Sequence, residues 1–199
     1  MPRLLLATTN QGKAAEYRDL LKGLDFELLT LDQAGISGEA EENCNTFEGN
    51  ARSKAEFYAA LSGLLTLADD SGLEVYALGG EPGVRSSRYA GDNATDAERV
   101  SFLLNKLRDI PQDRRQARFK CVIAIAQPGK PTQTAEGTCV GLIALQPQGD
   151  NGFGYDPIFY LLEYGRTIAE LSPEIKNRIS HRGQAAEKAR QLLVNLHGC

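Results

Sequence analysis

The sequence lacks the features that mark several large classes of protein. It has no tryptophan, one methionine and two histidines in 199 residues, which excludes a metal centre built from several histidines. Its four cysteines include no Cys-x-x-Cys pair, so we predict neither a zinc site nor a disulfide framework. These absences favour a reduced, cytoplasmic protein.

Long apolar runs are missing as well. The first run, residues 4–7, is too short for a signal peptide, and no later run approaches the ~20 residues that a membrane span requires. The formal net charge is −4, from 22 basic and 26 acidic residues. Because a duplex nucleic-acid binder needs a dominant positive field, we expect neither nucleic acid nor membrane as a partner.

The length and the apolar pattern indicate one α/β domain that spans residues 1–199. The predicted strands are residues 3–7, 26–31, 64–68, 119–126 and 139–145. Apolar residues at helical spacing follow Lys13 and predict a first helix. A second predicted helix runs from a cap at Thr46 to Ser62, and Gly63 closes it. Further helices are predicted after a capping box at Thr95, after Ser172 and after Ser180.

The first candidate site lies between the first strand and the first helix. It consists of Thr8, Thr9, Asn10, Gln11, Gly12 and Lys13. A helix start presents free backbone N–H groups that bind anions, and Lys13 adds positive charge in the first turn. This predicts a triphosphate cradle, although the glycine frame of a Walker A loop is absent. The alternative, an ordinary capped helix with an exposed lysine, is more frequent.

The second candidate site is acidic. Asp69 and Asp70 follow an apolar strand and precede a predicted glycine turn, which is where open α/β sheets place their ligands. The pair could bind Mg²⁺, or one carboxylate could serve as a base with a raised pKa. Glu41 and Glu42 would complete such a site if their loop folds over Asp70. The alternatives are an Asx-type turn and a solvated acidic loop.

The third candidate site combines a glycine-rich loop, residues 152–157, with scattered basic residues. Phe153 could stack on a nucleobase, and Asp156 could accept hydrogen bonds from ring N–H groups. The basic residues are Lys54, Lys176, His181 and Arg182. They suit a phosphate or a keto oxygen. The alternatives are a tight turn with a buried phenylalanine and a solvated helix face.

Seven sequence blocks follow one another in an informative order. They are Thr8-Thr9-Asn10-x-x-Lys13, Thr46-Phe47-x-x-Asn50-Ala51-x-x-Lys54-Ala55, Ala68-Asp69-Asp70-Ser71-Gly72-Leu73, Gly79-Gly80-x-Pro82-Gly83-Val84-x-Ser86-x-Arg88-Tyr89-x-Gly91, Gly152-Phe153-Gly154-Tyr155-Asp156-Pro157, Ala169-Glu170-Leu171 and Ser180-His181-Arg182. Each block alone is weak, but the ordered set is specific. It closely resembles the inosine/xanthosine triphosphate pyrophosphatase family over nearly the whole chain.

The resemblance implies a fold and an activity. The fold is a long twisted mixed sheet flanked by helices, with two lobes around a central active-site cleft, usually in a homodimer. The activity is Mg²⁺-dependent hydrolysis of ITP, dITP, XTP and dXTP to the monophosphate and pyrophosphate, which removes deaminated purine nucleotides from the pool. The alternatives are a pyrophosphatase with a different base preference and a nucleotide-binding regulator without turnover.

The resemblance also implies roles for individual residues. Asp70 is expected to be the catalytic base and a metal ligand, together with Glu41 or Glu42, of which we predict Glu41. Residues 8–13 and Lys54 would hold phosphates. Ser71 is expected to touch the substrate. The nucleobase and the adjoining phosphate would be held by Phe153, Gly154, Tyr155, Asp156, Lys176, His181 and Arg182.

Three places depart from the family's pattern. Gly49 stands where glutamate is frequent, Asn43-Cys44 stand where Thr-Gly is frequent, and Thr9 stands where Gly or Ser is frequent. Glycine in a first helical turn costs about 0.5–1 kcal/mol of helix stability. The change at Asn43-Cys44 puts the path of the acidic loop in question, and with it the choice between the two glutamates.

Overall fold

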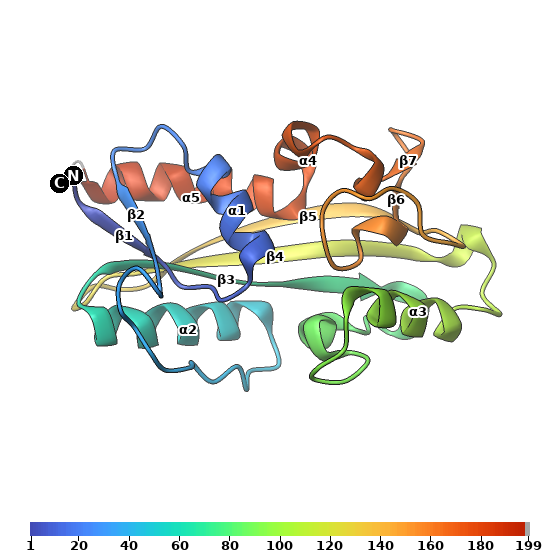
Figure 1. Cartoon of the computed structure of the whole chain (residues 1–199), viewed down its shortest axis with the longest axis horizontal. Helices are drawn as coiled ribbons and strands as arrows, with labels where there is room; N and C mark the ends of the chain where they lie inside the picture. Colours follow the sequence, from blue (N-terminus) through green and yellow to red (C-terminus); the bar gives the residue numbers. More distant parts are fainter. Residues whose placement is uncertain (198–199) are drawn as a thin grey trace. The chain divides into compact units, whose positions relative to one another are not determined.

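The computed structural model describes residues 1–197 as a seven-stranded mixed sheet with helices (Figure 1). The elements are β1 (Arg3–Leu6), α1 (Gln11–Leu20), β2 (Glu27–Thr30), α2 (Phe47–Ser62), β3 (Leu65–Val75), α3 (Asp96–Lys106), β4 (Gln116–Ala126), β5 (Gln133–Ile143), β6 (Phe159–Leu161), β7 (Arg166–Thr167), α4 (Pro173–Ile179) and α5 (His181–His197). The strand order is β2-β1-β3-β4-β5-β6-β7. Within the described residues, no helix has both the length and the apolar character needed to cross a membrane.

The sheet combines both kinds of strand pairing. β1 pairs in parallel with β2 and with β3, whereas β6 pairs antiparallel with β5 and β7. Parallel neighbours need a crossover connection, which α1 and α2 provide in the first part of the chain. The predicted mixed α/β fold is confirmed. The short strands β6 and β7 are not evident in the sequence pattern.

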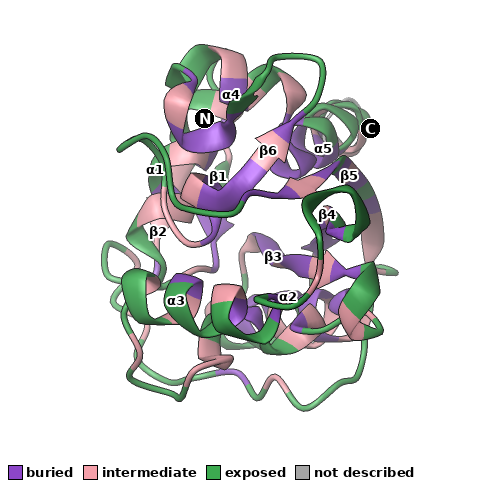
Figure 2. Cartoon of the chain, turned by 90° about the vertical axis from the view of Figure 1, so that its right-hand side faces the viewer, coloured by how far each residue is buried: buried purple, intermediate pink, exposed green. Residues whose placement is uncertain are grey.

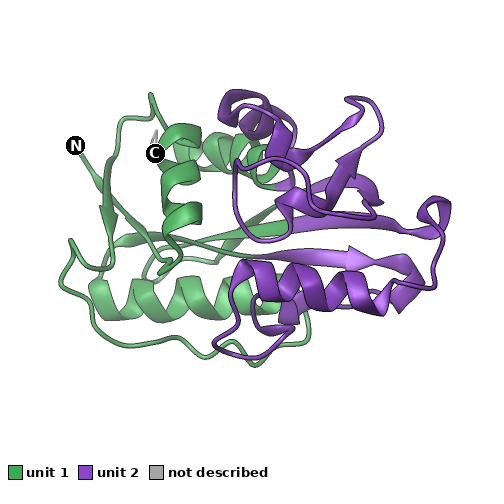
Figure 3. Ribbon diagram, turned by 45° about the vertical axis from the view of Figure 1, so that its right-hand side comes forward, with its two compact units in different colours: residues 1–70, 121–137, 182–199 green, residues 71–120, 138–181 purple. Residues whose placement is uncertain are grey.

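The chain divides into two compact units (Figure 3). Unit 1 contains residues 1–70, 121–137 and the chain from Arg182 onward. Unit 2 contains residues 71–120 and 138–181. Each unit therefore gathers segments that are distant in the sequence.

The core of unit 1 lies between the strands and two helices. Leu4, Leu6 and Leu67 from the strands pack with Tyr17 of α1 and with alanines and leucines of α5. Because successive strand residues point to opposite faces, the residues between these leucines face the other way. Figures 1 and 3 show α2 on that other side of the strands. α2 buries Ala51, Ala55 and Ala59, whose four-residue spacing forms one small-residue face.

The core of unit 2 also forms between strands and a helix. Val100 and Leu103 of α3 pack with Leu73 and Phe119 of the strands and with Phe159 of β6. The rings of Phe119 and Phe159 lie 4.5 Å apart between centroids. Figure 2 shows the buried positions along the strands and exposed positions on the outer surface of α3.

The helix starts follow the predicted caps. The side chain of Thr46 accepts from Gly49 N–H, and Gly63 closes α2 in the left-handed region with φ 70°. Thr95 and Glu98 form the capping box that begins α3. Ser172 caps α4, which has a proline in its first turn. These signals are local, which explains why the sequence locates them well.

The region around the two aspartates differs from the prediction. β3 runs without a break from Leu65 to Val75, so residues 69–72 lie within a strand and form no glycine turn. Leu73 and Val75 beyond them are fully buried. Pairing within the sheet and burial of these apolar side chains outweigh the turn preference of Asp and Gly.

Candidate active site

The segment before α1, residues 8–13, combines features of both alternatives from the sequence, a helix cap and a lysine directed inward. Asn10 caps the helix through Oδ1, which accepts from Lys13 N–H at 2.9 Å. Thr8 Oγ1 accepts from Asn10 N–H at 3.2 Å. The lysine, however, is not exposed, because its side chain is 15% accessible and its Nζ lies 3.0 Å from Asp69 Oδ2. The helix start is therefore capped and also directs a cation inward.

Asp69 lies at the centre of the charged groups of unit 1. It is 1% exposed, and Arg182 Nε lies 3.7 Å from its Oδ2. Burial alone would raise the pKa of this carboxyl, but the charges of Lys13 and Arg182 outweigh burial and hold the pKa well below its usual range. Asp69 is therefore an ionised carboxylate surrounded by cations.

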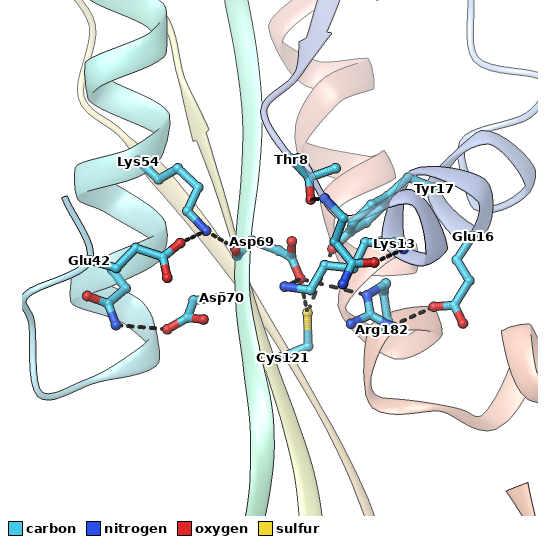
Figure 4. Close-up of polar contacts among 12 residues, drawn as sticks. Thr8, Lys13, Glu16, Tyr17, Glu42, Lys54, Asp69, Asp70, Cys121 and Arg182 are labelled. Carbon is cyan, nitrogen blue, oxygen red and sulfur yellow. Dashed lines mark hydrogen bonds and ion pairs between the residues drawn. The ribbon is translucent and has the colours of Figure 1, made fainter. Parts of the chain in front are cut away.

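Asp70 points to the opposite side of β3 (Figure 4). Its Oδ2 accepts from Asn50 Nδ2 at 2.9 Å. Burial raises the pKa of Asp70 above its usual value, although Lys13 and the Asn50 hydrogen bond act against the increase. The two aspartates therefore do not form a joint metal site, because adjacent strand residues face opposite ways. A buried carboxyl with a raised pKa suits a general base.

The acidic loop brings one of its two glutamates into this group. Glu42 forms an ion pair with Lys54, and its charge contributes to the raised pKa of Asp70. Glu41 is exposed and accepts instead from Asn43 Nδ2 at 2.9 Å. The structure thus places Glu42, and not the predicted Glu41, beside the candidate base.

The donor set fits a magnesium ion only together with a substrate. Within residues 1–197, no three His, Cys, Asp or Glu side chains are grouped as a metal site. Mg²⁺ commonly uses one or two protein carboxylates and completes its shell with water and phosphate oxygens. Asp70 and Glu42 supply such a pair of carboxylates.

Gly49 and Cys44, two of the residues that depart from the family pattern, compensate each other. A Cβ atom added at Gly49 would lie 2.8 Å from Cys44 Cβ and 3.1 Å from Cys44 Sγ. The space of the missing side chain is therefore filled by the cysteine. Cys44 N–H also donates to Asn50 Oδ1 at 2.9 Å. Asn50 thus links the acidic loop to Asp70, and its place in the second sequence block was the only signal for it.

A second cluster lies in unit 2 and contains the glycine-rich loop. Asp156 Oδ2 accepts from Phe153 N–H at 2.9 Å and from Lys176 Nζ at 2.5 Å. Lys176 Nζ also lies 4.6 Å from the centroid of the Phe153 ring. A Cβ atom at Gly152 would lie 2.1 Å from Asp156 Oδ2, so only glycine fits there. Phe153 is half-buried, which excludes the alternative of a phenylalanine in the core.

Two contacts from outside the loop hold it in place. Gly154 N–H donates to Asp96 Oδ2 at 2.7 Å. The hydroxyl of the buried Tyr155 donates to the backbone carbonyl of Ser86 at 2.9 Å. Tyr155 therefore anchors the loop from beneath. The contribution of Asp96 is not evident from the sequence, because its position indicates only a helix start.

The later basic residues are buried, so they do not form a solvated helix face. Lys176, His181 and Arg182 are each at most 5% exposed. In unit 2, the ring of His181 stacks on Phe119 with centroids 4.6 Å apart. Arg182 belongs to unit 1 and pairs there with Glu16. Ser71 is half-buried in β3, in the part of that strand that belongs to unit 2.

The sequence model of the Ham1 family matches residues 4–192. The chain belongs to the Ham1 family. A dITP/XTP pyrophosphatase of Desulforamulus reducens is 49% identical, and the match covers 98% of this chain and 97% of that relative. A dITP/XTP pyrophosphatase of Geobacter sulfurreducens is 48% identical, with 93% of each chain covered. These relatives confirm the resemblance found in the sequence.

Solved structures of the Ham1 family share the fold. A Ham1 protein from Coxiella burnetii superimposes with a TM-score of 0.89 at 45% identity, covering 98% of this chain and 100% of the other. The Staphylococcus aureus Ham1 protein gives a TM-score of 0.87 at 40% identity, covering 97% and 98%. The mixed sheet is therefore the fold of the family.

The contact between Gly49 and Cys44 in this Ham1-family chain can be tested with a double-mutant cycle. Gly49→Ala alone should lower the free energy of unfolding by about 1–3 kcal/mol, because the new methyl group overpacks against Cys44. In a Cys44→Gly background, the same change should cost at least about 1 kcal/mol less. Urea denaturation of the four proteins measures both values. Equal costs in the two backgrounds would show that the side chains do not compensate.

Proposed function

We propose that this chain hydrolyses the deaminated purine nucleotides ITP, dITP, XTP and dXTP to the nucleoside monophosphate and pyrophosphate, with Mg²⁺ as cofactor. The observation that supports this proposal most directly is the environment of Asp70, a buried carboxyl with a raised pKa that lies among the lysines of unit 1. The names of the relatives, dITP/XTP pyrophosphatase, support the substrate class.

Asp70 is assigned the role of base. A water molecule attacks the α-phosphorus, a new P–O bond forms, and the bond to the β-phosphate oxygen breaks. The proton of the water passes to Asp70, which burial makes a stronger base than an exposed aspartate. Asn50 donates to one carboxylate oxygen and so fixes the orientation of the other. Pyrophosphate leaves with the electron pair of the broken bond.

The cations of unit 1 suit the charge that develops on the departing pyrophosphate. Lys13 and Lys54 are held by Asp69 and Glu42, and the start of α1 presents backbone N–H groups beside Lys13. Fixed positive groups stabilise a phosphoryl-transfer transition state without having to reorganise. Asp70 and Glu42 would hold the magnesium ion, which when bound withdraws charge from a phosphate oxygen.

The cluster of unit 2 is assigned to binding the nucleobase of the substrate. Phe153 offers an aromatic face, and Lys176 and His181 are donors that suit a 6-keto oxygen. Adenine carries an amino group at that position, which leaves such a donor unpaired. A buried donor without a partner rejects a ligand strongly. Guanine also has a 6-keto oxygen, so its rejection needs an unfavourable fit for the 2-amino group.

A homodimeric, cytoplasmic enzyme remains a prediction from the family resemblance. The rival functions also remain testable. A pyrophosphatase for another base would favour a different nucleotide in the substrate test below, and a regulator without turnover would bind nucleotide but release no pyrophosphate.

Product analysis with dITP, dXTP, dGTP and dATP tests the proposal directly. We expect monophosphate and pyrophosphate from dITP and dXTP, little product from dATP, and no turnover in the presence of a chelator. dGTP should react more slowly than dXTP, and equal rates would refute the role of the 2-amino group. No turnover of any nucleotide would favour the regulator.

The base assignment predicts the behaviour of Asp70→Asn. The amide oxygen of the new side chain can still accept from Asn50, so the fold should persist. Turnover of dITP should fall by about 10²–10⁴-fold, the usual contribution of a general base. Binding of dITP, measured by calorimetry, should be retained. Substantial turnover by this variant would exclude Asp70 as the base.

The choice between the glutamates predicts a difference between two matched variants. Glu42→Gln should require a higher Mg²⁺ concentration for half-maximal turnover of dITP, by roughly 10-fold or more. Glu41→Gln, one residue away and with the same loss of charge, should change this concentration much less. Magnesium titrations of initial rates compare them, and the reverse order would restore Glu41 as the ligand.

A further inference from the structure

Asp69 contacts three cations of unit 1 through two different groups (Figure 4). Its carboxylate Oδ2 lies 3.0 Å from Lys13 Nζ and 3.7 Å from Arg182 Nε. Its backbone carbonyl accepts from Lys54 Nζ at 3.1 Å. A single strand residue thus binds one lysine with its side chain and the other lysine with its main chain.

We propose that Asp69 is a positioning residue that fixes Lys13 and Lys54 in the places from which they bind the substrate phosphates. The inference rests on the proposed function, which assigns the phosphates to these two lysines. Asp69 itself does not contact the substrate, because it is 1% exposed and its charge is directed at Lys13 and Arg182.

The physical benefit comes from the flexibility of lysine. Its four-carbon side chain loses rotamer entropy when it is ordered. The side chains of Lys13 and Lys54 are only 15% and 14% accessible, so this ordering takes place during folding. A phosphate then binds cations that are already in place, and the complex keeps more of the interaction energy.

Arg182 and Glu16 continue the network behind Asp69. Arg182 is 2% exposed, and its guanidinium lies 2.5 Å from Glu16 Oε2. The charges therefore alternate along the series Lys13, Asp69, Arg182 and Glu16, so that each buried charge has a partner of opposite sign. Glu16 and Lys13 both belong to α1. Arg182, from which the family resemblance leads us to expect a substrate contact, also lies beside Asp69 in this network.

The position of Asp69 separates it from the chemistry of Asp70. The two side chains leave β3 on opposite sides, and only that of Asp70 lies beside Asn50 and Glu42. Asp69 Oδ1 is buried and makes no hydrogen bond within residues 1–197. The role that remains for Asp69 is to hold cations.

Calorimetry with inorganic tripolyphosphate tests this role, because that ligand has phosphates but no base and its binding needs no turnover. In Mg²⁺ buffer, Asp69→Asn should raise the Kd for tripolyphosphate by about 10-fold or more, the usual loss for a charged hydrogen bond. The matched control is Cys121→Ala. Cys121 is buried with its Sγ 3.8 Å from Asp69 Oδ2, and its loss should leave the Kd unchanged.

A purely structural role for Asp69 makes a different prediction. Asp69→Asn would then lower the free energy of unfolding, but the folded fraction would bind tripolyphosphate as the wild type does, and this result would overturn the proposal. If Asp69→Asn does not fold, the variant Glu16→Gln tests the positioning role instead. Glu16 contacts Arg182 and is partly accessible, so a higher Kd supports the proposal and an unchanged Kd overturns it.

The same measurements separate this inference from the proposed function. Wild-type protein that hydrolyses dITP, combined with an unchanged Kd in Asp69→Asn, refutes the positioning role alone. Wild-type protein that does not hydrolyse dITP, combined with a raised Kd in the variant, refutes the proposed function alone. Wild-type protein that does not bind tripolyphosphate refutes the positioning role.

Discussion

The alternation of side chains along β3 is the constraint on which the site of unit 1 depends. A strand sends successive residues to opposite faces, so two adjacent aspartates receive opposite environments. Asp69 faces Lys13 and Arg182 and stays ionised, whereas Asp70 faces Asn50 and is a weaker acid than an exposed aspartate. One Asp-Asp pair can thus supply a fixed counter-ion and a candidate base.

Burial of these charges is tolerable because each has a partner. An isolated buried ion is strongly destabilising, whereas a series of alternating charges limits this destabilisation. Removal of one member leaves its neighbours as buried charges without that partner. The same logic holds in unit 2, where Lys176 and Asp156 are almost fully buried as a pair. In both units ion pairs within the chain hold the charged side chains, and charges held in this way suit the binding of a highly charged ligand.

Local interactions explain the parts of the structure that the sequence predicted well. The caps at Thr46, Thr95 and Ser172 involve side chains and backbone N–H groups within three residues, so their residue types suffice to locate the helix starts. The ordered sequence blocks likewise sufficed to recognise the family. Residues 69–72 differ from the predicted turn because the interactions that make them a strand, pairing in the sheet and burial of the neighbouring Leu73, involve residues remote in sequence.

The mixed α/β fold, the family and the set of candidate residues follow from the sequence. Which of these residues meet depends on the tertiary structure: Glu42 rather than Glu41 lies beside Lys54, Arg182 joins Glu16 and Asp69, and Cys44 fills the space left by Gly49. The physical reason is the range of the interactions. Caps and periodicity act within a turn or a strand, whereas ion pairs and close packing join segments that the chain alone does not bring together.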